Sequence, residues 1–279
     1  MKQDCHMHMV LDGVDWKAAI ARHKEGPQEQ FIRRVLQRYH ELGYDYLRDG
    51  GDRWGVGAKA REMAKEYDLT YRTPLAPVCK SGHYGAFIGQ KYETLREFRE
   101  IAGNLQKNGG DFLKIMISGL MDFDHFGVLS EEPLTAGEIR ELIHIGHEEG
   151  LAVMVHANGA RTVEAAATAG VDSVEHGAYL DEEALWAMKE NGTVWVPTLS
   201  TIANLRGKDR FSQTDVEKIL ESARKNVCRF AGMGGFLACG SDAGAWAVPH
   251  GAETEWGLLT ELTSPEVVRR GNEKIREKF

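Results

Sequence analysis

The stretch Phe-Leu-Lys-Ile-Met-Ile at 112–117 places one charged side chain inside an apolar run of strand length. Side chains on a strand alternate between two faces, so the leucine and the two isoleucines share one face while Lys114 lies on the other. A buried lysine is costly unless its charge is paired. Two interpretations follow: Lys114 forms an ion pair with Asp242, or its neutral amine captures carbon dioxide and bridges two metal ions as a carbamate.

Similar apolar runs alternate with helical patterns from one end of the chain to the other. The strand-like runs lie at 3–8, 43–48, 70–76, 111–118, 151–156, 171–176, 193–198 and 235–242. The helical patterns lie at 28–42, 57–67, 91–108, 135–149, 159–169, 181–191 and 213–232. Strands that alternate with helices form parallel sheets, and a chain of 279 residues suits one (β/α)8 barrel of roughly 250 residues. We therefore predict the α/β class and a single TIM-barrel domain over residues 1–279.

Polar side chains stand at the downstream ends of these runs, shortly before glycines. His6 and His8 are separated by one residue, so they project the same way, as two ligands of one metal must. The same alternation places Lys114, His156 and Asp242 on the inner face, at the rim where barrel active sites lie. Imidazole and carboxylate are the usual ligands of zinc and similar ions. The candidate metal ligands are His6, His8, Lys114, His156, His176 and Asp242.

Composition narrows the partners and the compartment. A formal net charge of −8 argues against a nucleic-acid partner, which would need a concentrated basic face. The chain shows no membrane span and its first residues form no signal peptide. The four cysteines are scattered, which indicates buried thiols in a reducing compartment. We therefore expect a cytoplasmic homo-oligomer that acts on a small molecule and has no nucleic-acid or membrane partner.

Short motifs extend this pattern over nearly the whole chain. They are Asp-Cys-His-Met-His (4–8), Leu-Arg-Asp-Gly-Gly (47–51), Ser-Gly-His-Tyr-Gly (81–85), Leu-Lys-Ile-Met-Ile-Ser-Gly (113–119), Val-His-Ala-Asn-Gly (155–159), Val-Glu-His-Gly (174–177), Trp-Val-Pro-Thr-Leu (195–199), Gly-Ser-Asp-Ala-Gly (240–244) and Pro-His-Gly (249–251). With these motifs the chain resembles the amidohydrolase superfamily, in the two-metal branch with a bridging lysine carbamate. Within that branch it is similar to the imidazolonepropionase-related, prolidase-like clade.

The resemblance implies two divalent ions, which we expect to be Zn²⁺. It assigns His6, His8 and Asp242 to the more buried ion, His156 and His176 to the other, and a Lys114 carbamylated by CO2 to the bridge between them. Relatives commonly carry a flanking β-sandwich, which we do not expect in this chain. Asn158 stands where the clade often has a histidine or tyrosine, and Lys114 argues against imidazolonepropionase activity itself.

Loops at the strand ends carry candidate substrate-binding residues. His83 and His250 are flanked by glycine in such loops, where barrel enzymes keep substrate contacts. Five cations are also expected at the mouth of the barrel: Arg53, Lys80, Arg206, Lys208 and Arg210. Their charge predicts an anionic substrate, and the prolidase-like resemblance agrees by pointing to a carboxylate on a dipeptide or N-acyl amino acid.

These features predict metal-dependent hydrolysis of an amide or peptide-like bond. Two metals would generate a shared hydroxide nucleophile and polarise the scissile carbonyl. Asp242 would take the proton and pass it to the leaving amine, which makes it the catalytic residue. Three alternatives remain open at this stage: a lactonase or esterase that uses the same site, a metal-dependent decarboxylase, and a barrel that lost its chemistry and serves as a scaffold.

Overall fold

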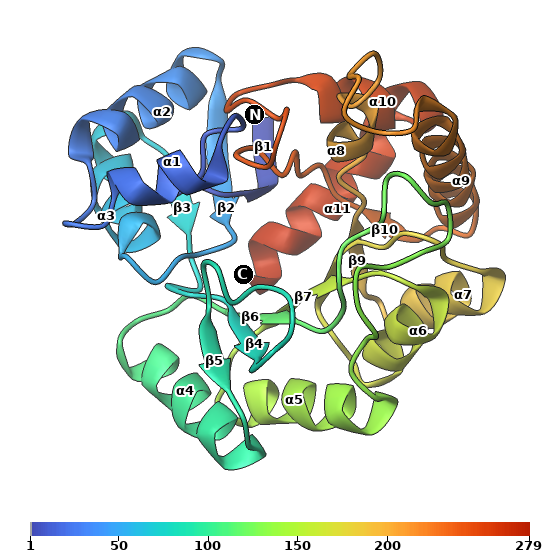
Figure 1. Ribbon diagram of the computed structural model, residues 1–279, viewed down its shortest axis with the longest axis horizontal. Coiled ribbons are helices and arrows are strands. Elements are labelled where there is room, and N and C mark those ends of the chain that lie inside the picture. Colours follow the sequence, from blue (N-terminus) through green and yellow to red (C-terminus); the bar gives the residue numbers. More distant parts are fainter. Residues whose placement is uncertain (1) are drawn as a thin grey trace.

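Parallel strands occupy the middle of the molecule and helices surround them in the computed structural model, which describes residues 2–279 (Figure 1). The strands are β1 (Lys2–Met7), β2 (Tyr44–Asp49), β3 (Thr70–Arg72), β4 (Val78–Lys80), β5 (Gln90–Tyr92), β6 (Leu113–Met116), β7 (Val153–Ala157), β8 (Ser173–His176), β9 (Val194–Val196) and β10 (Phe236–Leu237). The helices are α1 (Trp16–Arg22), α2 (Glu29–Glu41), α3 (Val56–Ala64), the 3-10 helix η1 (Lys65–Tyr67), α4 (Leu95–Lys107), α5 (Ala136–Glu148), α6 (Ala160–Thr168), α7 (Glu182–Glu190), α8 (Ser200–Ala203), α9 (Gln213–Gly232), α10 (Thr254–Leu262) and α11 (Pro265–Lys278).

The strands pair in two sheets, of order β1-β2-β3 and β10-β9-β8-β7-β6-β4-β5, and the pairings within them are parallel. On one side, backbone bonds link β1 to the segment after β10, for example from Cys5 N to the Cys239 carbonyl at 2.8 Å. On the other side, Asp111 N donates to the Thr73 carbonyl at 3.0 Å. The fold is therefore mixed α/β with parallel sheets, consistent with a TIM-barrel-like arrangement. Closure into one eight-stranded barrel stays a prediction.

Each of the eight strands expected from the sequence has a counterpart, but β4 and β5 were not expected. Each has three residues, which is too short for alternation to show. Strand β5 takes the first residues of the helix predicted at 91–108. That helix begins only at Leu95, after Thr94 and Glu97 form a reciprocal capping box.

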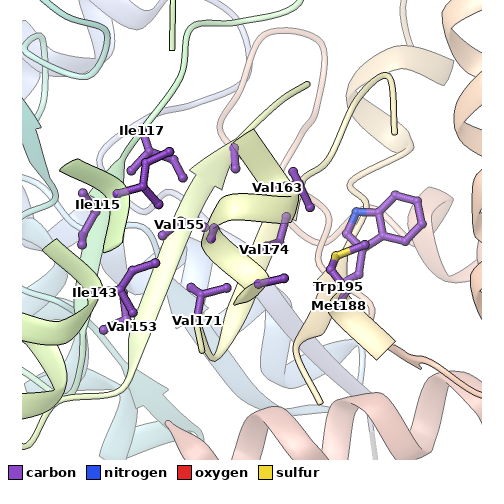
Figure 2. Close-up of a cluster of buried hydrophobic side chains, with 14 of the residues drawn as sticks. Ile115, Ile117, Ile143, Val153, Val155, Val163, Val171, Val174, Met188 and Trp195 are labelled. Atoms are coloured by element: carbon purple, nitrogen blue, oxygen red, sulfur yellow. The ribbon is translucent and has the colours of Figure 1, made fainter. Parts of the chain in front are cut away.

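The outer faces of the strands pack against the helices, as the alternation predicted. In β6 and β7, Leu113, Ile115, Val153 and Val155 belong to the large core between the sheet and its helices (Figure 2). The opposite faces supply a separate inner core that includes Phe112, Met154 and Ala238. The predicted inward and outward faces of these strands are confirmed.

Helix α11 packs against the inner core. Ile275 and Phe279 belong to that core, and the Phe279 ring packs edge-on against Phe112 with 5.2 Å between centroids. Figure 1 shows α11 crossing the central region of the view. Within residues 2–279, no helix is at once long enough and apolar enough to cross a membrane.

Contact between α11 and β10 depends on a glycine. A Cβ at Gly271 would lie 1.9 Å from the Leu237 carbonyl oxygen, whereas a Cβ at Gly257, an exposed position of helix α10, would meet nothing within 4 Å. We expect Gly271→Ala to lower the free energy of unfolding by roughly 1–3 kcal/mol or more, because the helix must move off the sheet. Gly257→Ala should be neutral or stabilise by up to about 1 kcal/mol. Thermal melting tests this, and equal melting temperatures for the two variants would contradict it.

Candidate metal centre

His6, His8 and Asp242 converge at the carboxyl-terminal ends of the strands. His6 lies in β1, His8 follows that strand, and Asp242 follows β10. His8 Nε2 lies 3.2 Å from Asp242 Oδ1 and 3.3 Å from His6 Nε2, and His6 Nε2 lies 3.5 Å from the same carboxylate oxygen. One ligand atom from each of these buried residues lies within 4.8 Å of the others. Two imidazoles and a carboxylate form a donor set that suits zinc.

Glycines let the chain close tightly around these ligands. A Cβ at Gly50 would lie 2.2 Å from Cε1 of His8, and a Cβ at Gly240 would lie 2.7 Å from the backbone nitrogen of His6. Any larger residue at either position would displace a ligand ring or the strand that carries it. The glycines seen in the motifs thus make room for the histidines.

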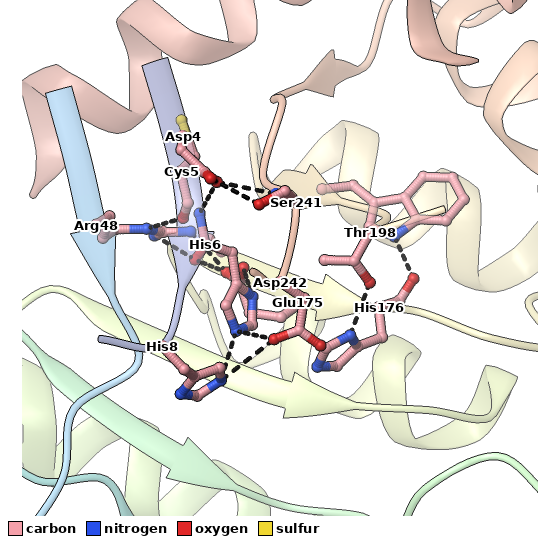
Figure 3. A network of polar contacts seen from close by, with 12 residues as sticks. Asp4, Cys5, His6, His8, Arg48, Glu175, His176, Thr198, Ser241 and Asp242 are labelled. Carbon is pink, nitrogen blue, oxygen red and sulfur yellow. Dashed lines mark hydrogen bonds and ion pairs between the residues drawn. The ribbon is translucent and has the colours of Figure 1, made fainter. Parts of the chain in front are cut away.

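A buried ion pair fixes the ring of His6. His6 Nδ1 donates a hydrogen bond to Glu175 Oε2 at 2.8 Å, and Arg48 Nη2 donates to Glu175 Oε1 at 2.8 Å (Figure 3). Arg48 Nε also donates to the Cys5 carbonyl at 2.6 Å. Burial would raise the pKa of Glu175, but the charge of Arg48 and the bond from His6 lower it to about 2. Because Nδ1 carries the proton, His6 Nε2 keeps its lone pair for a metal.

A second buried carboxylate positions the segment that carries Asp242. Asp4 Oδ1 accepts a hydrogen bond from Ser241 N at 2.9 Å, and Asp4 Oδ2 accepts one from Ser241 Oγ at 2.6 Å and one from Tyr39 Oη at 3.0 Å. Burial raises the pKa of Asp4 to about 6, although these hydrogen bonds lower it. These contacts hold β1 against Ser241. They therefore fix the distance between His6, which lies in β1, and Asp242, which follows Ser241.

His156 and His176 lie beside this cluster. Their ring centroids are 4.5 Å apart, and the His176 ring lies 5.2 Å from that of His6. His156 Nε2 donates to the Gly119 carbonyl at 3.1 Å, and His176 Nδ1 lies 2.8 Å from Thr198 Oγ1. Within residues 2–279, these bonds leave His156 Nδ1 and His176 Nε2 free. Metal binding by these two nitrogens stays a prediction.

Two of the candidate ligands, His176 and Asp242, have left-handed backbone conformations that depart from a strand. His176 has φ +70° and Asp242 has φ +57°, values that are uncommon for residues other than glycine. Val174 packs in the outer core, so simple alternation would also turn His176 outward. The left-handed backbone instead brings its ring beside His156. Such conformations cost free energy and cluster at functional sites.

Lys114 is buried without a partner. It is 1% exposed, and its Nζ has no hydrogen-bond partner among the residues that the structure describes. The same residues place no carboxylate within ion-pair distance of Nζ, so the predicted alternative of a pair with Asp242 is wrong. Burial lowers the pKa of Lys114 to about 8, although the charges of Glu175 and Asp242 raise it. A larger share of this amine is therefore neutral at pH 7 than in an exposed lysine.

Four of the other candidate ligands, His6, His156, His176 and Asp242, have the protonation states that metal binding requires. Burial lowers the pKa of His6 to about 4, that of His156 to about 3 and that of His176 well below its usual value. Burial alone would raise the pKa of Asp242, but the neighbouring His6, His8 and Lys114 lower it overall. At neutral pH these three imidazoles are therefore uncharged and the carboxylate of Asp242 is ionised.

A cavity of about 940 Å³ opens from these residues. All six predicted ligands line it, together with apolar side chains from the surrounding loops. Asn158, which stands in place of a ring, also lines it. Its Nδ2 donates to the Gly119 carbonyl at 3.0 Å and its Oδ1 accepts from Ala178 N at 3.0 Å. Asn158 thus joins the loops that follow β6 and β8.

The structure does not bring the two predicted substrate-binding histidines to the wall of the cavity. His83 and His250 are not among the residues that line the cavity. His83 Nδ1 lies 3.3 Å from Glu131 Oε1, and His250 Nε2 donates to the Leu11 carbonyl at 2.9 Å. Their contact with a substrate stays a prediction.

The five loop cations do not gather at the cavity. Lys80 pairs with Glu138, and Arg206 makes two hydrogen bonds to Glu217, at 2.7 and 2.6 Å. Of the five predicted cations, only Arg210 lines the cavity. The expectation of a cationic mouth is therefore wrong for Lys80 and Arg206, since carboxylates of the chain itself already hold them.

Sequence reasoning did not single out Arg48 and Glu175, which organise the centre. Both were quoted only as parts of motifs. A signal was available, because each is a charged residue inside a predicted strand, as Lys114 is. Two opposite charges on buried strands predict a buried pair, and a buried carboxylate beside a histidine ligand predicts an orienting partner.

Known proteins are similar to this chain in sequence and in fold. The scan against protein families finds no match. Ochratoxinase from Aspergillus niger is 25% identical over 300 residues, which span 93% of this chain and 61% of that protein. The chain thus spans about three fifths of the length of the curated relatives it matches.

Solved structures share the fold. A crystal structure of a Xaa-Pro dipeptidase superposes with a TM-score of 0.77 at 22% identity, and the match covers 99% of this chain and 75% of the dipeptidase chain. The A. niger ochratoxinase structure superposes with a TM-score of 0.77 at 19% identity, and the match covers 99% of this chain and 70% of the ochratoxinase chain. A structure of a protein named as an amidohydrolase superposes with a TM-score of 0.72 at 21% identity, and the match covers 96% of this chain and 71% of the other. The structural neighbours are amidohydrolase-family proteins, and the likeness to them shows a shared fold.

The buried pair behind His6 can be tested without substrate. Arg48→Met should lower the free energy of unfolding by about 3–5 kcal/mol, because Glu175 is left charged, buried and unpaired. Adding Glu175→Gln should recover part of that loss, since no net charge then stays buried. Urea denaturation of metal-free protein measures both variants. If the double variant is no more stable than Arg48→Met, the charge of Glu175 is not what the arginine compensates.

Proposed function

We propose that this protein is a metal-dependent hydrolase of amide or peptide-like bonds. The observation that carries the proposal is a set of ligand-type side chains whose free donor atoms face one cavity at the strand ends. Lys114 Nζ and Asp242 Oδ1 are buried without a hydrogen-bond partner within residues 2–279. Buried polar atoms without partners are costly, and cations at this point would satisfy them. The donor set fits two divalent ions, and we propose zinc.

In this proposal His6, His8 and Asp242 hold one ion, His156 and His176 hold the other, and Lys114 as a carbamate lies between them. When bound, the ions would supply a water of lowered pKa and a positive charge beside the scissile carbonyl. Glu175 keeps His6 in the tautomer that a metal needs. The same arrangement leaves the cavity side of the centre open to a substrate.

Asp242 is the residue proposed to move the proton. Its carboxylate lines the cavity and lies 3.2 Å from His8 Nε2, so it stands at the edge of the ligand cluster. It can accept a proton from the attacking water and donate it to the departing nitrogen. An amine is a poor leaving group until it is protonated, so this residue suits amides. A protein named Xaa-Pro dipeptidase is similar to this chain, which supports dipeptides as substrates, and N-acyl amino acids contain the same kind of amide bond.

The proposal predicts hydrolysis that depends on Asp242. Zinc-reconstituted protein is screened against dipeptides, N-acyl amino acids and lactones, and cleavage is followed by chromatography. Asp242→Asn should lower kcat on the best amide by about a hundredfold or more. Asp209→Asn, in an exposed loop, is the matched control and should retain kcat. Near-normal turnover by Asp242→Asn would place the proton-transfer group elsewhere, and cleavage of lactones alone would contradict the amide assignment.

The bridge is tested at Lys114. Lys114→Ala should lose most activity, because the proposed anionic bridge between the ions is gone. Short-chain acids such as acetate should restore part of the activity by occupying the space of the carbamate. Lys91→Ala, at an exposed lysine in β5, serves as the control and should need no rescue. A crystal structure with unmodified Lys114 and both ions fully occupied would contradict the carbamate.

A further inference from the structure

The segment that follows β9 touches both halves of the candidate centre. Thr198 Oγ1 lies 2.8 Å from His176 Nδ1 (Figure 3). Two residues later, Ser200 Oγ donates a hydrogen bond to the Ser241 carbonyl at 2.7 Å. Ser241 directly precedes Asp242. One short segment therefore reaches a candidate ligand of one proposed ion and the residue next to a candidate ligand of the other.

The peptide group between Ser241 and Asp242 is held at both of its polar atoms. Its carbonyl accepts the hydrogen bond from Ser200 Oγ, and its N–H donates to the His6 carbonyl at 2.7 Å. The orientation of this peptide helps to determine the φ of Asp242, which is +57°. A left-handed backbone at a residue other than glycine costs free energy and persists only where surrounding contacts fix it. Ser200 thus supplies one of the contacts that fix the backbone of Asp242.

Thr198 itself has a left-handed backbone, with φ +49°. Such a value is an outlier for a β-branched residue, because the Cβ crowds the neighbouring carbonyl oxygen. The side chains of Thr198 and Ser200 are fully buried. A buried segment in a strained conformation needs contacts from other parts of the fold that hold it there.

The carboxyl group of Glu255 in α10 supplies such a contact. Glu255 Oε2 accepts a hydrogen bond from Ser200 N at 2.7 Å. Glu255 is 1% exposed and is not among the residues that line the cavity. Burial raises the pKa of Glu255 to about 7, although hydrogen bonds from the backbone of Ser200 and Leu199 lower it. A large share of this carboxyl group is therefore neutral at pH 7.

Glu255 differs in its surroundings from an ordinary glutamate of the same helix. Its Oε1 has no hydrogen-bond partner within residues 2–279. A buried polar atom without a partner costs free energy that an apolar side chain of similar size would not cost. Glu261, also in α10, is exposed and pairs with Arg224 at 2.9 Å. The hydrogen bond to the strained segment is the feature that sets Glu255 apart.

We propose that Glu255 is a positioning residue that fixes the segment 198–200 and, through it, the ring of His176 and the backbone of Asp242. In this account His176, Thr198 and Asp242, which all have left-handed backbones, are joined by one network that ends at Glu255. The consequence for metal binding rests on the proposed function, whereas the geometry can be measured on metal-free protein.

The geometry is tested by NMR of metal-free, full-length protein with ¹⁵N-labelled histidine. The ring signals of His176 are assigned through their absence from His176→Gln. Glu255→Ala should shift or broaden these signals, because the segment that contacts the ring is released. Glu255→Gln should leave them in place, since the amide oxygen still accepts from Ser200 N. The signals of His147, which lies in α5 against Asp172, should stay unchanged in each variant and report an intact fold.

The consequence for metal binding is tested by the zinc Kd, measured in competition with a chromophoric chelator. Glu255→Ala should weaken zinc binding about tenfold to a hundredfold, as loss of a residue that orients metal ligands does. Glu255→Gln keeps an acceptor oxygen and should stay within about threefold of the wild type. Glu261→Ala is the matched control in the same helix and should not change the Kd. Equal effects of Glu255→Ala and Glu255→Gln, or no effect of either, would overturn the positioning role.

Ser200→Ala tests the route to Asp242 and stays informative if Glu255→Ala does not fold. It removes the hydroxyl that donates to the Ser241 carbonyl but keeps the N–H that donates to Glu255. Zinc binding should weaken about tenfold, while the His176 signals of the metal-free protein stay in place. An unchanged zinc Kd would overturn the route through Ser200.

These measurements keep the positioning role separate from the proposed function. A wild-type protein that binds no zinc or cleaves no amide contradicts the proposed function, and the His176 signals of the metal-free protein then decide the role of Glu255 alone. A wild-type protein that cleaves amides, with His176 signals and zinc Kd unaltered in Glu255→Ala, would support the proposed function and overturn the positioning role.

Discussion

The hydrogen bond from His6 to Glu175 is the constraint on which the candidate metal centre depends. It fixes both the tautomer and the orientation of a ring that contacts His8 and Asp242. A carboxylate buried this completely would ordinarily bind a proton, and a protonated carboxyl could not accept this bond in the same way. Arg48 keeps Glu175 ionised, and the Phe279 ring lies 4.4 Å from the Arg48 guanidinium carbon. Phe279 therefore supports His6 through Arg48 and Glu175.

Strands and loops have separate tasks in this molecule. The strands carry four of the six candidate ligands, His6, Lys114, His156 and His176, where packing leaves little freedom. The loops after them carry aromatic rings and Arg210, which line the cavity above. Because changes in the loops leave the strands in place, the lining of the cavity can vary while the candidate ligands keep their positions.

The sequence predicted the elements and ligands that follow strict alternation. Lys114 and His156 lie on the inner faces of β6 and β7, as their spacing required. His176 is different, because alternation from Val174 would send it outward, and only its φ of +70° brings it to the site. The Arg48–Glu175 pair joins residues 127 positions apart, so local patterns do not reveal the partner.

Loop contacts were the least predictable part for the same reason. Lys80 and Arg206 each meet a carboxylate of the chain that spacing alone does not indicate, whereas Arg210 meets two aromatic rings.

The central claim is that the strand-end cluster is a two-ion centre. Anomalous diffraction from zinc-reconstituted crystals at the zinc edge tests it most directly. The account predicts two peaks, one among His6, His8 and Asp242 and the other beside His156 and His176. No peak among the first three residues would contradict it.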